Sequence, residues 1–211
     1  MTRAIGPVVP THRDPGLDEV LWGTWRAVEL PEGYRAEIVE GFIEVSPTGR
    51  YRPGGIVNRL HRALNDFPTR TPAGTGWVAG NDMNVIHDPK VWIPDLFVAP
   101  EDDEPHITDD GLGLRASCLE VVVEVVSPGH ESVSRDRIRK RRAYARAGIP
   151  GYLLLDDHDE GGTVTLLTSP SPGEAVYLEE TRTPYGTPVT VPTGSAKGFV
   201  ITEAITGPSG A

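Results

Sequence analysis

The spacing of apolar residues predicts a chain in which helices and strands are interspersed. Apolar residues recur at helical spacing over residues 17–28, 53–67 and 134–147, and Gly148 is placed to end the last of these helices. Alternating or continuous apolar runs predict strands over residues 34–40, 42–45, 77–86, 91–98, 119–126, 152–156, 163–168 and 175–178. The first two strands are expected to form a hairpin that turns at Glu40-Gly41. This order of elements predicts an α/β or α+β class with a mixed central sheet flanked by helices.

The length and composition are those of one soluble domain. The 211 residues are 38% hydrophobic and contain a single cysteine, Cys118, so no internal disulfide can form. We expect residues 1–17, rich in Pro and Gly, to form a flexible arm, residues 18–206 to form one domain, and residues 207–211 to be a tail. No signal peptide or membrane span is recognisable, which favours a cytoplasmic protein.

The charge is acidic overall but segregated along the chain. The net charge is −10, which argues against a general nucleic-acid coat protein. Acidic residues are concentrated in residues 101–104, 109–110 and 156–160, where we expect solvated loops. Basic residues are concentrated in 135–146, so any positive surface is local.

Two carboxylates in apolar strands are the first candidates for chemistry. Glu124 lies within a run of valines, and Asp95 follows Pro94 in another apolar strand. An ionised carboxylate in a strand interior is unfavourable unless it is paired or bound to a metal. The alternatives are an arginine partner for Glu124 and a local turn hydrogen bond for Asp95. Together the two would form a hard oxygen pair suited to Mg²⁺ or Mn²⁺, whereas no Cys/His spacing indicates zinc.

A lysine and several arginines on the predicted helix 134–147 complete the candidate site. In an α-helical projection Lys140 shares its face with small and aromatic residues, and this face should pack inward. The alternative is a helical pair with Asp136. If Lys140 is catalytic, its replacement is expected to leave folding nearly unchanged. The opposite face carries Arg135, Arg139, Arg142 and Arg146, which form either a phosphate-contacting stripe or a solvated face.

These segments resemble the Uma-two family of restriction-endonuclease-like proteins, within the PD-(D/E)xK nuclease superfamily. The resemblance extends from about Leu17 to Ile205. It rests on four stretches taken together: Tyr34 to Gly41, Ile93-Pro94-Asp95-Leu96, Val123 to Pro128, and Asp136 with Lys140, Tyr144, Ala147-Gly148 and Tyr152.

The resemblance implies roles for particular residues. Asp95 and Glu124 would be the metal carboxylates, Lys140 the catalytic lysine, and Glu37 the acidic residue of the first motif. In the wider superfamily the lysine usually lies two residues after the second carboxylate. That position is Val126 here, so the lysine function would have moved to the helix. A homodimer is the expectation that the family suggests.

We therefore expect a metal-dependent endonuclease that hydrolyses phosphodiester bonds in DNA. Asp95 and Glu124, with the backbone carbonyl of Val125, would hold Mg²⁺ or Mn²⁺. Lys140 would orient the attacking water or stabilise transition-state charge, and Arg139, Arg142 and Arg146 would contact the nucleic acid. Two alternatives stay open: a catalytically silent nucleic-acid-binding or regulatory module on the same fold, and a hydrolase of small phosphodiesters.

Overall fold

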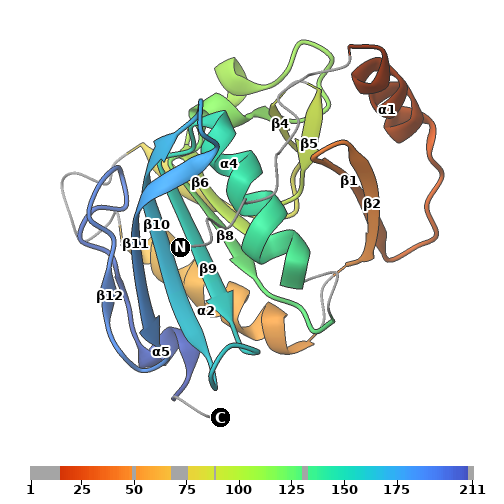
Figure 1. The fold of residues 1–211 in the computed structure, drawn as a ribbon. Helices are drawn as coiled ribbons and strands as arrows, with labels where there is room; N and C mark the ends of the chain where they lie inside the picture. The colour runs from red at the N-terminus through yellow and green to blue at the C-terminus, as the bar shows by residue number, and fades with distance from the viewer. Residues whose placement is uncertain (1–14, 49–50, 68–75, 88, 130–132, 209–211) are drawn as a thin grey trace, which may run out of the picture.

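The strands form two main sheets, both visible in Figure 1. The computed structural model describes residues 15–48, 51–67, 76–87, 89–129 and 133–208. The six-stranded sheet has the order β11-β10-β9-β8-β6-β3, with bounds Val176–Pro184, Thr163–Ser171, Gly151–Asp156, Val121–Val125, Leu96–Pro100 and Trp77–Gly80. The five-stranded sheet has the order β2-β1-β5-β4-β7, with bounds Phe42–Pro47, Tyr34–Val39, Lys90–Trp92, Val85–His87 and Leu114–Arg115. Strands β12 (Val189–Thr190) and β13 (Val200–Ile201) form a small antiparallel pair.

Helices cover both faces of the six-stranded sheet, as the sequence predicted. Helix α2 (Tyr51–Asp66) packs Ile56, Leu60 and Leu64 against one set of apolar side chains from β8 and β9. Helix α4 (Arg141–Ala147) packs on the other face, where Tyr144 contacts a second apolar cluster. Because β8 is buried on both faces, its run of valines matches its position. The β8–β9 pair is parallel and β6–β8 is antiparallel, so the mixed sheet is confirmed.

The remaining helical segments are short or lie at the periphery. Among the described residues they include α1 (Pro15–Ala27), α5 (Glu203–Thr206) and the 3₁₀ turns η3 (Glu104–His106) and η4 (Ala116–Cys118). Most of the predicted flexible arm, residues 1–14, lies outside the described residues. Cys118 is buried and has a free thiol. Within the described ranges, no helix has the length and apolar character needed to span a bilayer.

The predicted hairpin forms with its turn at Glu40-Gly41. Strands β1 and β2 pair antiparallel from Val39↔Phe42 to Tyr34↔Pro47. Both turn residues have positive φ, 46° at Glu40 and 87° at Gly41. Two consecutive positive φ values characterise the type I′ turn, whose twist matches that of the flanking strands. The short loop therefore fixes the register, and Glu37 lies opposite Glu44.

The strands predicted over 77–86 and 91–98 are wrong as continuous elements, because each is divided between the two sheets. The first is interrupted near Asp82, whose φ is 53°, and continues as β4. The second is interrupted after Trp92, because Pro94 has no N–H to donate to a ladder. The chain thus passes from β3 to β4, from β4 to β5, and back to β6. Asp95 lies at the return point, where the two sheets meet.

The helix predicted over 134–147 forms, but it is not a regular α-helix along its whole length. Residues Arg135–Lys140 form a π-helical segment, η5, and α-helical geometry begins only at Arg141. A π-helix closes i→i+5 hydrogen bonds, so an α-helical projection does not apply to its residues. Arg135 is consequently buried, in contrast to the predicted outward stripe. The helix ends at Gly148 in the left-handed conformation, as expected.

Candidate active site

The strand register brings Asp95 and Glu124 together. Strands β6 and β8 pair Leu96 with Val123, so one step further along this ladder Asp95 and Glu124 are neighbours. The backbone N–H of Val125 donates to Asp95 Oδ2 over 2.8 Å, which fixes the aspartate against β8. Glu124 is buried, whereas the Asp95 side chain is 21% exposed. One carboxylate of the pair is therefore accessible and the other is enclosed.

Lys140 lies between two buried glutamates. Its Nζ is 2.8 Å from Glu124 Oε1 and 2.8 Å from Glu37 Oε1, and its side chain is fully buried. Glu37 reaches this point from β1, where its Oε1 also accepts a hydrogen bond from the Ile93 N–H over 2.7 Å. Lys140 thus pairs with Glu37 and Glu124, and not with Asp136, the partner expected for a simple helical pair. We refer to Glu37, Asp95, Glu124 and Lys140 as the carboxylate–lysine cluster.

Tyrosines close the inner side of the cluster. The Tyr144 hydroxyl donates to Glu124 Oε1 over 2.5 Å, so this oxygen accepts from both Tyr144 and Lys140. Tyr144 packs edge-on against Trp92 and Tyr152, with ring centroids 5.1 and 5.2 Å apart. Burial, followed by the charge of Glu124, raises the pKa of Tyr144 well above its ordinary value. Tyr144 is therefore a permanent donor that orients Glu124.

Two arginines support the cluster from its edges. Arg35 Nη2 donates a hydrogen bond to Asp95 Oδ1 over 3.3 Å. Arg35 lies two residues before Glu37 on β1, so the two side chains are on the same face of that strand. Arg135 makes a bidentate pair with the buried Asp136, with contacts of 2.8 and 3.2 Å. Sequence reasoning did not single out Arg35, and it placed Arg135 in the outward stripe. The i, i+2 spacing of Arg35 and Glu37 was a usable signal, whereas the Arg135–Asp136 pair depends on the π-helical geometry.

Burial separates the pKa values of the two glutamates. Burial raises the pKa of Glu124 to about 8, an effect that Lys140 opposes and Asp95 reinforces. For Glu37, burial also favours the neutral form, but Lys140 and Arg35 together outweigh it and lower the pKa. Burial alone would lower the pKa of Lys140, yet the two glutamates raise it above its ordinary value. Near neutral pH, Lys140 is therefore a cation, and the Glu124 carboxyl group holds a proton for most of the time.

The raised pKa of Glu124 predicts that the protein loses stability as pH rises from about 5 to 8. The ordinary value is 4.5, so within this window the folded state holds a proton that the unfolded chain has released. The free energy of unfolding should fall by up to about 1.4 kcal/mol per pH unit from this group. Thermal unfolding of wild type and Glu124→Gln between pH 5 and 8 measures it. Parallel pH profiles of the two proteins would contradict the assignment.

The three arginines predicted to contact nucleic acid all lie beside carboxylates of the β1–β2 hairpin. We call Arg139, Arg142 and Arg146 the arginine row. Arg139 forms an ion pair with Glu44 at 2.5 Å. Arg142 and Arg146 both face Glu40, and their side chains are 31% and 44% exposed. The row is thus at the surface but is not an unoccupied positive stripe.

The donor set of the cluster fits a hard divalent cation. Asp95 and Glu124 supply adjacent carboxylates, and Glu37 Oε2 is buried without a hydrogen-bond partner. In the part of the chain that the structure describes, no three or more His, Cys, Asp or Glu side chains form a ready-made metal site. Mg²⁺ commonly takes one or two carboxylates and keeps several waters, which the adjacent carboxylates of Asp95 and Glu124 can satisfy. The Val125 N–H donates to Asp95, so the backbone at Val125 lies beside this carboxylate.

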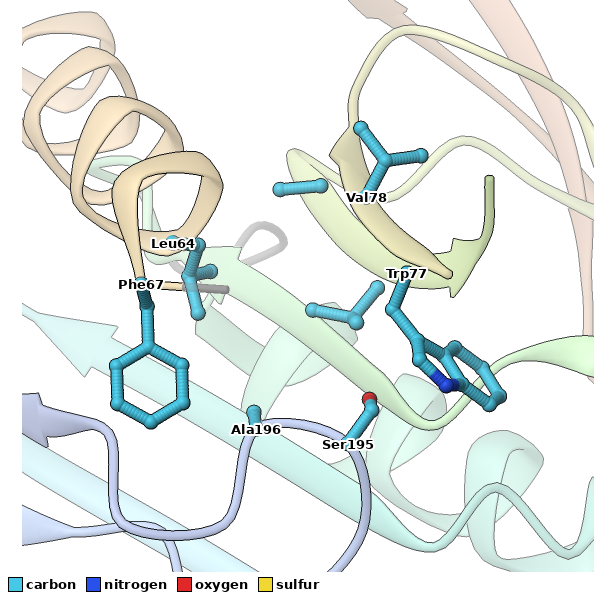
Figure 2. A pocket seen from close by; sticks show the side chains of 8 residues that line it. Leu64, Phe67, Trp77, Val78, Ser195 and Ala196 are labelled. Atoms are coloured by element: carbon cyan, nitrogen blue, oxygen red, sulfur yellow. The ribbon is translucent and has the colours of Figure 1, made fainter. Parts of the chain in front are cut away.

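Two hollows lie away from the carboxylate–lysine cluster. A cavity of about 10 Å³ lies between α2, β3 and the segment around Ser195, and Figure 2 shows its largely apolar lining. It has room for about one water molecule. A shallower hollow of about 400 Å³ lies between Trp22, His87 and the loop around Asp109. Neither is lined by a residue of the cluster.

Comparison with known proteins agrees with this fold and family. The chain shares the fold of a protein from Anabaena variabilis ATCC 29413 described as a "putative nuclease belonging to DUF820". The TM-score is 0.62 at 18% identity, and the match covers 90% of this chain and 96% of that chain. The Uma2 family profile, described as "Putative restriction endonuclease", matches residues 24–202. The chain therefore belongs to the Uma2 family, which confirms the resemblance seen in the sequence. No curated protein matches the chain significantly.

Proposed function

We propose that this protein is a metal-dependent endonuclease that hydrolyses phosphodiester bonds in DNA. The observation that supports this most directly is the convergence of Asp95, Glu124 and Lys140 from two strands and a helix. The family assignment supports nuclease chemistry in general. DNA as the substrate, a homodimer and a cytoplasmic location are further parts of the proposal.

Asp95 and Glu124, with the Val125 carbonyl, are the residues that would hold Mg²⁺ or Mn²⁺. A divalent cation held there would supply Lewis-acid activation of water and would neutralise charge on the scissile phosphate. Glu37 contributes negative charge beside them and holds Lys140 in place through its 2.8 Å ion pair. Arg35 restrains Asp95, so the accessible carboxylate is already oriented.

Lys140 acts as a cation in this mechanism. Its raised pKa excludes a neutral amine near pH 7, so it does not serve as the general base. Its Nζ instead orients the attacking water by donating a hydrogen bond, or stabilises the charge that develops on the phosphate oxygens. Lys140 would have this role from a helix, whereas Val126, directly after β8, is buried in the apolar cluster that also contains Tyr144.

A plasmid assay tests the proposal. The full chain with Mn²⁺ should convert supercoiled DNA to nicked and linear forms, and EDTA or Glu124→Gln should abolish this conversion. A chromogenic phosphodiester assayed in parallel separates the alternatives. Turnover of the small diester without plasmid cleavage would indicate a small-phosphodiester hydrolase. DNA binding without turnover of either substrate would indicate a silent binding module on the same fold.

A further inference from the structure

The β1–β2 hairpin contacts every member of the arginine row. Arg142 forms a bidentate pair with Glu40, through Nε–Oε1 at 3.0 Å and Nη2–Oε2. Arg146 Nη1 approaches the same carboxylate at 3.9 Å, and Arg139 Nη1 lies 2.5 Å from Glu44 Oε1. These pairs join segments about one hundred residues apart, and Figure 1 shows the hairpin beside the helix. The surface predicted for DNA phosphates is therefore covered by carboxylates of the same chain.

The backbone conformation of Glu40 indicates that a glutamate at this position has a role beyond forming the turn. Its φ of 46° lies in the left-handed region, at the first central position of a type I′ turn. Asn or Gly is favoured at this position, and a glutamate gains nothing locally from it. A non-glycine residue held in such a conformation points to a function for the side chain. The function visible in the structure is the contact with Arg142 and Arg146.

A carboxylate that binds arginine in this way resembles a phosphodiester. Both present two oxygens to the guanidinium fork, and both satisfy the same pair of N–H donors. We propose that Glu40 and Glu44 occupy the phosphate-binding positions of the arginine row, so that a polynucleotide backbone must displace them to bind. The inference rests on the proposed function, because it takes nucleic acid as the ligand.

The hairpin register places this exchange next to the carboxylate–lysine cluster. Glu44 lies opposite Glu37 in the β1–β2 ladder, and their partners Arg139 and Lys140 are consecutive on the helix. A phosphate that takes the position of Glu44 therefore binds next to the ion pair that holds Lys140. Displacement of the hairpin carboxylates then coincides with arrival of the backbone at the candidate active site.

Matched variants in a DNA-binding assay test the proposal. Glu40→Gln removes a carboxylate from Arg142, and Glu180→Gln removes one from Arg141, whose 2.8 Å pair lies on the other side of the helix. With duplex DNA in EDTA, Glu40→Gln with Glu44→Gln should lower the Kd about 5-fold or more. The salt dependence should steepen by about one for each arginine released. Glu40→Gln alone should also lower the Kd, whereas Glu180→Gln, which changes the net charge by the same amount as Glu40→Gln, should change the Kd less than 2-fold.

A double-mutant cycle and a second variant make the outcome decisive. The gain from Glu40→Gln should disappear in a background with both Arg142→Gln and Arg146→Gln, because both cations that face Glu40 are then absent. Glu40→Asn should reproduce the gain while suiting the turn, so a folding defect cannot explain it. Equal gains in Glu40→Gln and Glu180→Gln, or no DNA binding by the double variant, would overturn the inference. Tight binding without Mn²⁺-dependent cleavage would count against the proposed function alone.

Discussion

Replacement of Lys140 by methionine should lower the free energy of unfolding by about 3–5 kcal/mol. The lysine is fully buried, and its removal leaves Glu37 and Glu124 facing each other without a cation. Adding Glu37→Gln to Lys140→Met removes the uncompensated charge of Glu37, whose pKa is lowered, and should recover part of the loss. Denaturant unfolding at pH 7 measures all three proteins. This predicted loss differs from the expectation from sequence that replacing Lys140 leaves folding nearly unchanged, because the structure shows the lysine fully buried between two glutamates.

The matched control is Arg146→Met on the same helix. The Arg146 side chain is 44% exposed and lies 3.9 Å from its carboxylate, so its loss should change stability by less than about 0.5 kcal/mol. The cleavage rate of Lys140→Arg, which keeps the charge, should still fall at least about 10²-fold. A planar guanidinium cannot reproduce one nitrogen shared at 2.8 Å by two carboxylates. Full cleavage by Lys140→Arg would remove the lysine from the mechanism.

Mn²⁺ at about 100 times its Kd should stabilise the wild-type protein by about 2.7 kcal/mol, because it binds only the folded state. Asp95→Asn and Glu124→Gln should each remove most of this stabilisation, measured as the metal-dependent rise in Tm. Without metal, Asp95→Asn should also lower the Tm, since Asp95 accepts from Arg35 and the Val125 N–H. This reverses the simpler expectation that removing one of two neighbouring carboxylates relieves repulsion.

Asp82→Asn is the control for the metal experiment. Asp82 also approaches Arg35, at 3.9 Å, but its side chain is 73% exposed and lies outside the carboxylate–lysine cluster. Its replacement should leave the Mn²⁺ response intact. If Asp95→Asn and Glu124→Gln respond to Mn²⁺ as the wild type does, the assignment of the two carboxylates to a metal site is wrong.

The sequence was most informative where local patterns decide the structure. The valine run of β8, the Glu40-Gly41 turn and the Gly148 helix end were all predicted, because each depends on neighbouring residues. The inward position of Lys140 was predicted for a similar reason. Lys140 directly precedes the α-helical segment that contains Tyr144, so the projection held between these two residues.

Features that depend on distant residues were not predictable in this way. The division of residues 91–98 between two sheets depends on which partner strand each half finds, and Pro94 marks only the interruption. The π-helical segment changes which side chains share a face, so Arg135 was placed outside although it is buried. The pairs between the arginine row and the hairpin join residues that no local window contains. The sequence alone predicts a stripe of arginines exposed to solvent, whereas in the structure each of these arginines is paired with a glutamate of the hairpin.

The origin of the cluster in separate elements also bears on the order of folding. Glu37 and Lys140 are separated by more than one hundred positions, and contacts of that range form late because loop closure is unfavourable before packing compensates it. Along the chain Glu37 comes first and Lys140 last, so the lysine is the last of the four residues to leave the ribosome. The cluster is complete only after β1 and the helix have both docked on the sheets. A nascent or partly unfolded chain therefore lacks the assembled carboxylate–lysine cluster.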